Sequence, residues 1–252
     1  MKPFIDLTGK TILVTGASSG IGRAVAILIS ELGAKGILIA RREDQLRESV
    51  DRMAGVAAWY SADLQDVDGI DGLMSRIITE HGPLDGFVHS AGISTTVALR
   101  ALTMNMMEKS MRLNFYSFLE IARCITRKNC FNPPMSIVAI SSLGAVQGRA
   151  GGTIYCASKA ALDASVRCLA RELAPKMIRV NSVAPALIKT AMYNDLRDRL
   201  KQSEQVQNVV DRQYMGVGEP EDVANIVCYL LSSAAKYVTG ASIPLDGGRL
   251  TT

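Results

Sequence analysis

Histidine is scarce in this sequence, and its scarcity argues against several kinds of active site. The 252 residues include only two histidines, His81 and His89. Two imidazoles are too few for a His-rich metal site and leave little scope for a Ser-His-Asp triad. We therefore expect no metal ion and no hydrolytic triad.

Cysteine is also sparse, and long apolar runs are missing. The five cysteines are odd in number and include no C-x-x-C pair, which is typical of reduced thiols in the cytoplasm rather than of a disulfide framework. The N-terminus lacks the apolar core of a signal peptide. No run approaches the ~18 apolar residues that a membrane-spanning helix needs. We predict a cytoplasmic protein with no membrane partner.

Charge is nearly balanced and not concentrated. The 28 basic and 24 acidic residues give a net charge of +4, and no basic block stands out. A nucleic-acid partner is therefore not indicated, although the slight positive excess suits an anionic cofactor or substrate. Apolar residues make up 48% of the chain, enough for a large core.

Short apolar runs alternate with helical repeats along the whole chain. We predict strands at 11–14, 36–40, 56–59, 84–89, 136–140, 177–183 and 241–245, and helices at 21–32, 67–81, 103–128, 153–174 and 219–232. No linker, repeat or low-complexity segment interrupts this alternation. The sequence therefore predicts a single α/β domain over residues 1–252, with about seven strands in a doubly wound, Rossmann-type parallel sheet and helices on both faces.

A glycine-rich segment follows the first predicted strand directly. Gly16, Gly20 and Gly22 lie between this strand and the next helix, where backbone amides and a helix N-terminus can bind a pyrophosphate. Side chains at these positions would block a close approach. The spacing departs from G-x-G-x-x-G, and an ordinary tight turn is the alternative. The strand–loop–helix context favours a dinucleotide site.

A tyrosine and a lysine form a possible acid/base pair. Tyr155 and Lys159 are four residues apart in a predicted helix, so their side chains share one helix face. A free phenol has a pKa of about 10, and a close cation lowers this value by ~1–3 units. The spacing also occurs by chance. Gly16, Ser142 and Pro185 follow other predicted strands, and we expect them at the same sheet edge.

Taken together and in order, these motifs resemble the short-chain dehydrogenase/reductase family, in its branch of about 250 residues. The resemblance covers nearly the whole chain, and the interval of thirteen residues between Ser142 and Tyr155 matches the family and selects Ser142 over Ser141. The residues that match the family are Thr15–Gly22, Ser90–Gly92, Asn114, Ser142, the Tyr155/Lys159 pair, and Thr239-Gly240 with Asp246–Gly248.

The resemblance implies a role for each catalytic position. Tyr155 would exchange the proton, Ser142 would bind the carbonyl oxygen, and Lys159 would lower the pKa of Tyr155 and bind the nicotinamide ribose. Asn114 would help to hold a water that relays protons. Cofactor binding is implied for Gly16, Ser18, Ser19, Gly20, Ile21, Gly22, Arg41, Arg42, Asp63, Leu64, Ser90, Ala91, Gly92, Tyr155, Lys159, Pro185, Ile188 and Thr190.

The end of the second strand indicates which cofactor is used. NAD-preferring family members usually carry an acidic residue there, whereas this chain has Arg41 and Arg42. A guanidinium can grip a 2′-phosphate, so we predict NADP(H) rather than NAD(H), with Arg41 as the preferred contact. The alternative is that both arginines simply begin the next helix on a solvated face.

Two positions depart from the family pattern. His89 and Ser90 stand where the family commonly has two asparagines, and we interpret His89 as a structural substitute. Ala186 replaces a common glycine. Because alanine resists positive φ, we expect the loop beside the nicotinamide to bend differently.

The substrate is less well defined. The resemblance places specificity in residues 187–215 and 143–153, which mix apolar and polar side chains. The general likeness is to bacterial 3-oxoacyl-(acyl-carrier-protein) reductases, which implies a 3-oxoacyl thioester, free or carrier-bound. A sugar, polyol or other secondary-alcohol dehydrogenase is the alternative, and a non-catalytic NADP(H) sensor is a second one. Family members are commonly homotetramers, so we expect a homotetramer or homodimer.

Overall fold

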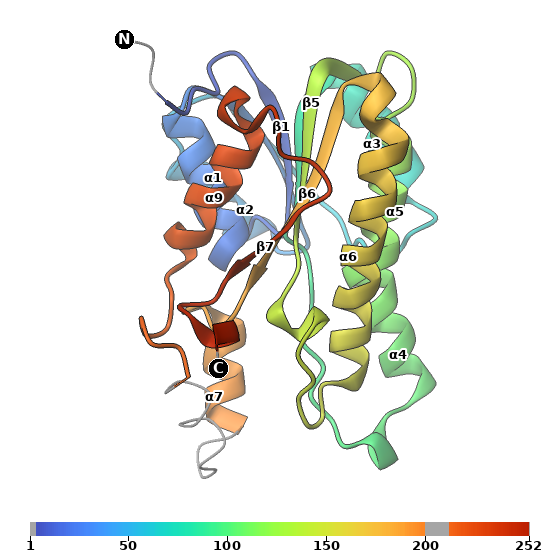
Figure 1. Cartoon of the computed structure of the whole chain (residues 1–252). Coiled ribbons are helices and arrows are strands. Elements are labelled where there is room, and N and C mark those ends of the chain that lie inside the picture. Colours follow the sequence, from blue (N-terminus) through green and yellow to red (C-terminus); the bar gives the residue numbers. More distant parts are fainter. Residues whose placement is uncertain (1–3, 200–211, 252) are drawn as a thin grey trace.

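The computed structural model contains one seven-stranded parallel sheet (Figure 1), and it describes residues 4–199 and 212–251. The strand order is β3-β2-β1-β4-β5-β6-β7. The strands are β1 (Thr11–Thr15), β2 (Lys35–Ala40), β3 (Ala57–Ser61), β4 (Leu84–His89), β5 (Phe131–Ile140), β6 (Ile178–Pro185) and β7 (Ser242–Leu245). The predicted doubly wound α/β fold is confirmed.

Helices cover both faces of the sheet (Figure 1). One face carries α1 (Gly20–Glu31), α2 (Glu43–Asp51) and α9 (Pro220–Leu231), and the other carries α3 (Ile70–His81), α4 (Met104–Met111), α5 (Ser117–Ile125) and α6 (Thr153–Leu173). Successive strand residues alternate between the two cores: Leu13 packs into one and Ile12 and Val14 into the other. Since both faces of the central strands β1, β2 and β4 are buried, these strands appear as continuous apolar runs.

The sheet edge that matters for function lies at the carboxyl ends of the strands. β1 is central, with β2 on one side and β4 on the other, so the chain reverses its direction of winding between β1 and β4. Ligands of open α/β sheets bind in the crevice at such a switch point. A ligand site is therefore expected between the loops after β1 and β4.

The predicted helix 103–128 is interrupted. Between α4 and α5, residues Arg112–Tyr116 form a π-helical turn, which inserts one residue and shifts the faces of the two halves. Asn114 lies within this turn and is fully buried. The apolar spacing on either side still looks helical, which is why the sequence did not reveal the insertion.

Other boundaries differ from the predictions for local reasons. Met177 has a φ of 59°, which is incompatible with an extended strand, so β6 begins one residue later than predicted. The poorly periodic region predicted as a substrate loop at 187–215 contains the helix α7 (Ala191–Arg199). Residues 200–211 of that prediction lie outside the described residues.

Candidate active site

A cavity of about 570 Å³ opens at the carboxyl edge of the sheet. The loops after β1, β2, β4, β5 and β6 line it, together with the start of α7. Cavities of this size and position are typical of cofactor and substrate sites in open α/β sheets.

Glycines let the loops after β1 and β4 touch. Gly16 has a φ of +68°, and an added Cβ would lie 2.7 Å from the backbone nitrogen of Ala91. At Gly22 an added Cβ would lie 2.4 Å from the carbonyl oxygen of Gly16, so Gly22 packs the loop against its helix and does not line the cavity. Gly16 and Gly20 line it with Ser18, Ser19 and Ile21. This glycine-lined cradle at the N-terminus of α1 fits the pyrophosphate of a dinucleotide.

Thr15 organises the loop after β4, a role that the sequence did not indicate. Its hydroxyl oxygen accepts hydrogen bonds from the backbone nitrogens of Ser90 (3.2 Å) and Ala91 (3.3 Å) and contacts His89 Nδ1 at 3.1 Å. Both acceptor positions of the hydroxyl are thus occupied, so its proton is donated to Nδ1. The proton of neutral His89 is therefore on Nε2, and the backbone groups of Leu113 and Asn114 are its neighbours.

His89 should make the protein sensitive to acid. Burial, then the charge of Lys159, lowers its pKa from 6.5 to about 3, so the folded chain keeps it neutral while the unfolded chain protonates below pH 6.5. The unfolded state binds more protons between these values, so stability falls as the pH falls. At pH 5 we expect this histidine alone to cost about 2 kcal/mol of unfolding free energy.

Denaturant unfolding of the wild type and His89→Asn at pH 7.5 and pH 5 measures this loss. The difference between the two pH values should shrink more in His89→Asn than in His81→Asn, because burial also lowers the pKa of His81 but leaves that side chain less enclosed. An undiminished pH difference in His89→Asn would show that His89 is not the group responsible.

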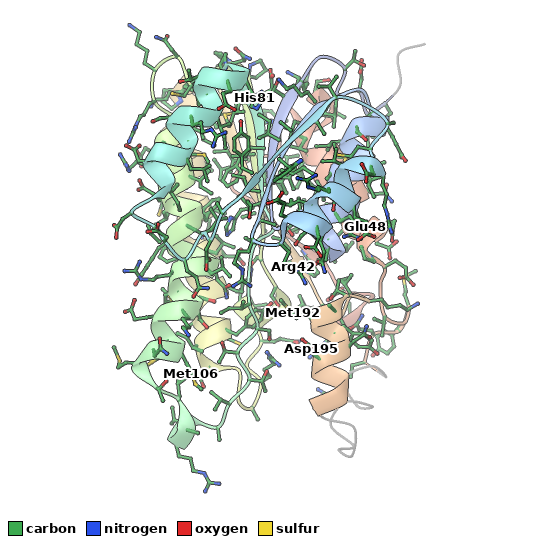
Figure 2. All side chains as sticks on the ribbon, turned by 180° about the vertical axis from the view of Figure 1, so that it is seen from behind. Arg42, Glu48, His81, Met106, Met192 and Asp195 are labelled. Carbon is green, nitrogen blue, oxygen red and sulfur yellow. The ribbon has the colours of Figure 1, made fainter. Side chains whose placement is uncertain are left out.

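The two arginines after β2 are held differently. Arg42 Nη2 donates hydrogen bonds to the hydroxyls of Ser18 (3.3 Å) and Ser19 (3.1 Å), so its guanidinium lies on the glycine loop. Arg41 Nη1 lies 4.0 Å from Asp63 Oδ2. Both arginines line the cavity, as does Leu64, whereas Asp63 does not. Figure 2 shows Arg42 at this edge of the sheet and His81 at the opposite end.

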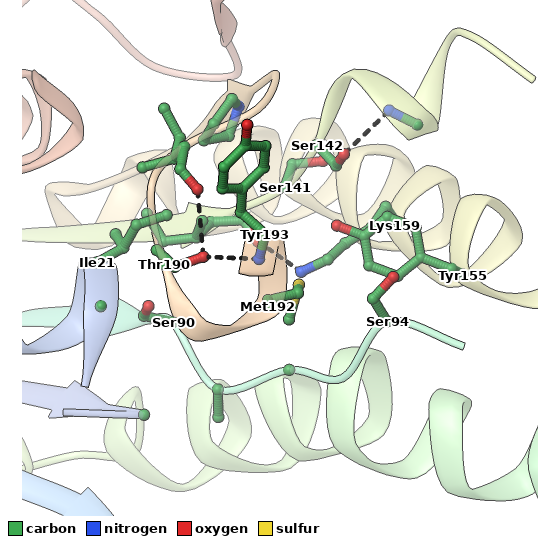
Figure 3. A pocket seen from close by; sticks show the side chains of 18 of the residues that line it. Ile21, Ser90, Ser94, Ser141, Ser142, Tyr155, Lys159, Thr190, Met192 and Tyr193 are labelled. Carbon is green, nitrogen blue, oxygen red and sulfur yellow. Dashed lines mark hydrogen bonds between the residues drawn. The ribbon is translucent and has the colours of Figure 1, made fainter. Parts of the chain in front are cut away.

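Ser142, Tyr155 and Lys159 converge on the cavity wall formed by β5 and α6 (Figure 3). The Ser142 hydroxyl accepts a hydrogen bond from the backbone nitrogen of Gly144 (3.0 Å), which fixes its orientation. The Lys159 ammonium donates to the carbonyl oxygen of Ile140 (2.7 Å). The first two turns of α6 and the segment after β5 thus place a phenol, an ammonium and a hydroxyl on one wall of the cavity.

The pKa values of Tyr155 and Lys159 are set mainly by burial in this structure. Burial raises the pKa of Tyr155, and hydrogen bonding with Ser142 and the charge of Arg149 oppose the rise. Lys159 is not among these influences. Burial lowers the pKa of Lys159 to about 8, against the charge of Asp163. Arg149 is thus a cation that lowers the pKa of the phenol, and the lowering by Lys159 stays a prediction.

Asn114 lies behind the cavity rather than on its wall. Its Oδ1 accepts from the Ile93 nitrogen (2.9 Å), and its Nδ2 donates to the Ile93 carbonyl (3.0 Å) and the Ser158 hydroxyl (2.9 Å). The side chain thus joins the loop after β4 to α6. Both amide hydrogens are used, and the predicted water-holding role stays a prediction.

The remaining predicted contacts lie on the cavity. Ser90, Ala91, Gly92, Pro185, Ile188 and Thr190 all line it. Ala186 has no positive φ, and its nitrogen donates to the carbonyl of Leu245 (3.1 Å). Met192 and Tyr193 line the cavity from α7; they lie within the predicted specificity segment 187–215, but the sequence did not single them out. They belong to a polar segment with no clear period.

Comparison with known proteins gives consistent matches over the whole chain. A family model described as enoyl-(acyl carrier protein) reductase matches residues 16–249. L-xylulose reductase of Caenorhabditis elegans is 36% identical over 246 residues, covering 96% of each chain. 3-Oxoacyl-(acyl-carrier-protein) reductase of Rickettsia felis is 36% identical over 248 residues, covering 98% of this chain and 99% of the relative.

The fold also has a counterpart in a solved structure. A 3-oxoacyl (acyl-carrier-protein) reductase from Agrobacterium tumefaciens C58, with NADP bound, matches with a TM-score of 0.89 and 28% identity. The match covers 96% of this chain and 95% of that one.

Proposed function

Because the chain belongs to the short-chain dehydrogenase/reductase family, whose members matched here are oxidoreductases, we propose that it transfers a hydride between NADP(H) and a carbonyl compound or secondary alcohol. Tyr155 is the general acid in reduction and the base in oxidation. The observation that carries the proposal is the convergence of Ser142, Tyr155 and Lys159 beside the glycine-lined cradle.

Each residue has a distinct part in the reaction. The cofactor, when bound, supplies or accepts the hydride. Ser142 donates a hydrogen bond to the carbonyl oxygen and so stabilises the negative charge that develops there. Tyr155 protonates that oxygen. Lys159 carries positive charge up to about pH 8, and this charge favours the phenolate that Tyr155 leaves behind.

NADP(H) is the proposed cofactor because of the arginines after β2. Both guanidinium groups line the cavity at the end of the glycine loop, where a forked donor suits a phosphate. The NADP bound to the Agrobacterium relative supports the same choice.

Two substrate classes have support. We place 3-oxoacyl thioesters first, free or carrier-bound, because several relatives are reductases of this type. A ketose or other polyhydroxy ketone is the second class, since L-xylulose reductase is equally similar. A non-catalytic NADP(H) sensor is disfavoured because all four catalytic positions are retained.

A panel of carbonyl compounds tests the proposal. We expect at least one member to oxidise NADPH, followed by the loss of nicotinamide absorbance, when acyl thioesters, ketoses and steroid ketones are compared. A protein that binds NADPH yet reduces no member, and oxidises no corresponding alcohol with NADP⁺, would contradict it and favour the sensor.

We also propose that the protein works in the cytoplasm as a homo-oligomer. Within the described part of the chain, no helix is long and apolar enough to cross a membrane, and all five cysteines are free thiols. Leu119 of α5 and Leu169 of α6 line a shallow groove with Tyr116, which is 38% exposed. A second copy could cover this surface, and the molar mass in solution tests the assembly.

A further inference from the structure

The charges on the cavity wall are of one sign. Its lining includes five cations and, among the residues that the structure describes, no aspartate or glutamate. Arg41 and Arg42 lie at the glycine-loop end, and Lys159 lies beside Tyr155. The other two cations are Arg149 and Arg249. The proposed cofactor gives a role to the first three residues and none to the last two.

Arg149 lies against the catalytic tyrosine. Its guanidinium carbon is 5.3 Å from the centre of the Tyr155 ring, within the range of a cation–π contact. Its Nη2 donates to the Ser94 hydroxyl at 2.9 Å. Figure 3 shows Ser94 beside Tyr155 and Lys159. No carboxylate of the described residues forms an ion pair with Arg149, so its charge faces the cavity with only a neutral hydrogen-bond partner.

Further positive charge gathers around Arg149. Arg249 comes from the short helix Arg249–Thr251 near the C-terminus. Burial, and after it the charge of Arg212, lowers its pKa; Asp246 opposes the change, and Arg149 adds to it. Arg149 and Arg249 line the same cavity, so their like charges repel each other. An anion bound between them would relieve this repulsion.

We propose that the substrate carries an anionic group, a carboxylate or a phosphate, which Arg149 binds a few bonds away from the reacting carbonyl. This inference rests on the proposed function and narrows its substrate. The planar guanidinium matches either group through two parallel hydrogen bonds. Contact with the Tyr155 ring fixes the donor beside the proton donor, so the anion also orients the carbonyl.

The location separates this anion from those of the cofactor. The glycine loop and the N-terminus of α1 suit the pyrophosphate, and Arg41 and Arg42 suit the 2′-phosphate, all at the β1–β2 side of the cavity. Arg149 lies in the loop between β5 and α6, on the side of Tyr155. A second anion-binding position is therefore available to the substrate.

Matched substrates that differ only in charge test the proposal. Suitable pairs are a small oxo acid with its methyl ester, a ketose phosphate with its ketose, and a 3-oxoacyl thioester whose chain ends in a carboxylate with one ending in a methyl group. We expect kcat/KM for the anionic member of at least one pair to exceed that of the neutral member by about tenfold or more, as charged hydrogen bonds in a desolvated site allow. The carboxylate and phosphate pairs show which anion is preferred.

Variants of Arg149 assign the effect to one residue. Arg149→Gln should lower kcat/KM for the anionic member about 10- to 100-fold more than for the neutral member, because any effect on Tyr155 is common to both. Arg149→Lys should recover part of the loss, because the charge remains but the fork is gone. Arg47→Gln removes an exposed arginine outside the cavity, paired with Glu43 at 2.8 Å, and should leave the ratio unchanged.

A second variant displaces Arg149 without removing its charge. An alanine Cβ at Gly152 would lie 2.5 Å from Arg149 Cγ and 2.9 Å from its Nε, so the arginine must move. Gly152 has a φ of −95°, which alanine adopts readily. Gly152→Ala should therefore also lower the anionic preference, with a melting temperature near that of the wild type.

The outcomes separate the inference from the function on which it rests. Equal kcat/KM within every pair would overturn the anion site and leave NADP(H)-dependent carbonyl reduction intact. An anionic preference unchanged in Arg149→Gln would overturn the assignment to Arg149. Failure to turn over any member of either charge, with NADPH binding intact, would overturn the proposed function and the inference with it.

Discussion

Replacing Tyr155 by phenylalanine is expected to lower kcat about 10²- to 10⁴-fold, the range that a positioned general acid contributes. The change removes only the hydroxyl, so the ring that contacts Arg149 remains. Lys159 keeps its hydrogen bond to Ile140, and NADPH affinity should change less than about threefold. Steady-state rates and fluorescence titration with NADPH measure the two quantities separately.

A second tyrosine serves as the control for this variant. Tyr237 is 99% exposed, and Tyr237→Phe should behave like the wild type in both measurements. If Tyr155→Phe kept more than about a tenth of the wild-type rate, another group would have to supply the proton, and the assignment would be wrong. Joint loss of rate and of NADPH affinity would instead indicate damage to the cavity.

Replacing both Arg41 and Arg42 by glutamine is expected to weaken NADPH binding about 10- to 100-fold, because each guanidinium hydrogen bond to a phosphate oxygen is charge-assisted. NADH lacks that phosphate, so its affinity should change less than about threefold. The dissociation constants of the two cofactors, measured for wild type and variant at one ionic strength, give the result.

The two single variants distinguish the arginines. The sequence predicts Arg41 as the preferred contact, whereas the structure shows Arg42 bonded to the hydroxyls of Ser18 and Ser19 on the glycine loop. The single substitution that costs more affinity identifies the main phosphate ligand. Tighter NADH than NADPH binding by the wild type would contradict the cofactor choice altogether.

The parts of the fold that the sequence predicted share one physical cause. Strands β1, β2 and β4 are buried on both faces and therefore appear as unbroken apolar runs. The glycines after β1 were identifiable because the contact between Gly16 and the backbone of Ala91 excludes any side chain. At these positions the tertiary packing demands a particular residue type, apolar in the strands and glycine in the loop, so the sequence alone reveals it.

The parts that were missed depend on contacts between distant segments. The π-helical turn around Asn114 forms where its amide bonds both Ile93 and Ser158, which no local pattern reveals. Helix α7 has a polar sequence without clear periodicity. The contact of Arg149 with Tyr155 depends on how the loop between β5 and α6 folds back.

The hydrogen bonds of Asn114 connect the cofactor side of the site with the helix that carries the proton donor. Ile93 follows the Ser90–Gly92 segment at the cofactor side, and Ser158 is next to Lys159 and donates to the carbonyl of Tyr155 at 2.7 Å. A continuous, partly buried chain of hydrogen bonds therefore runs from the dinucleotide loop to the backbone of Tyr155. If cofactor binding orders this chain of hydrogen bonds, it raises the affinity for the substrate, and substrate binding raises the affinity for the cofactor by the same factor, because such coupling is reciprocal.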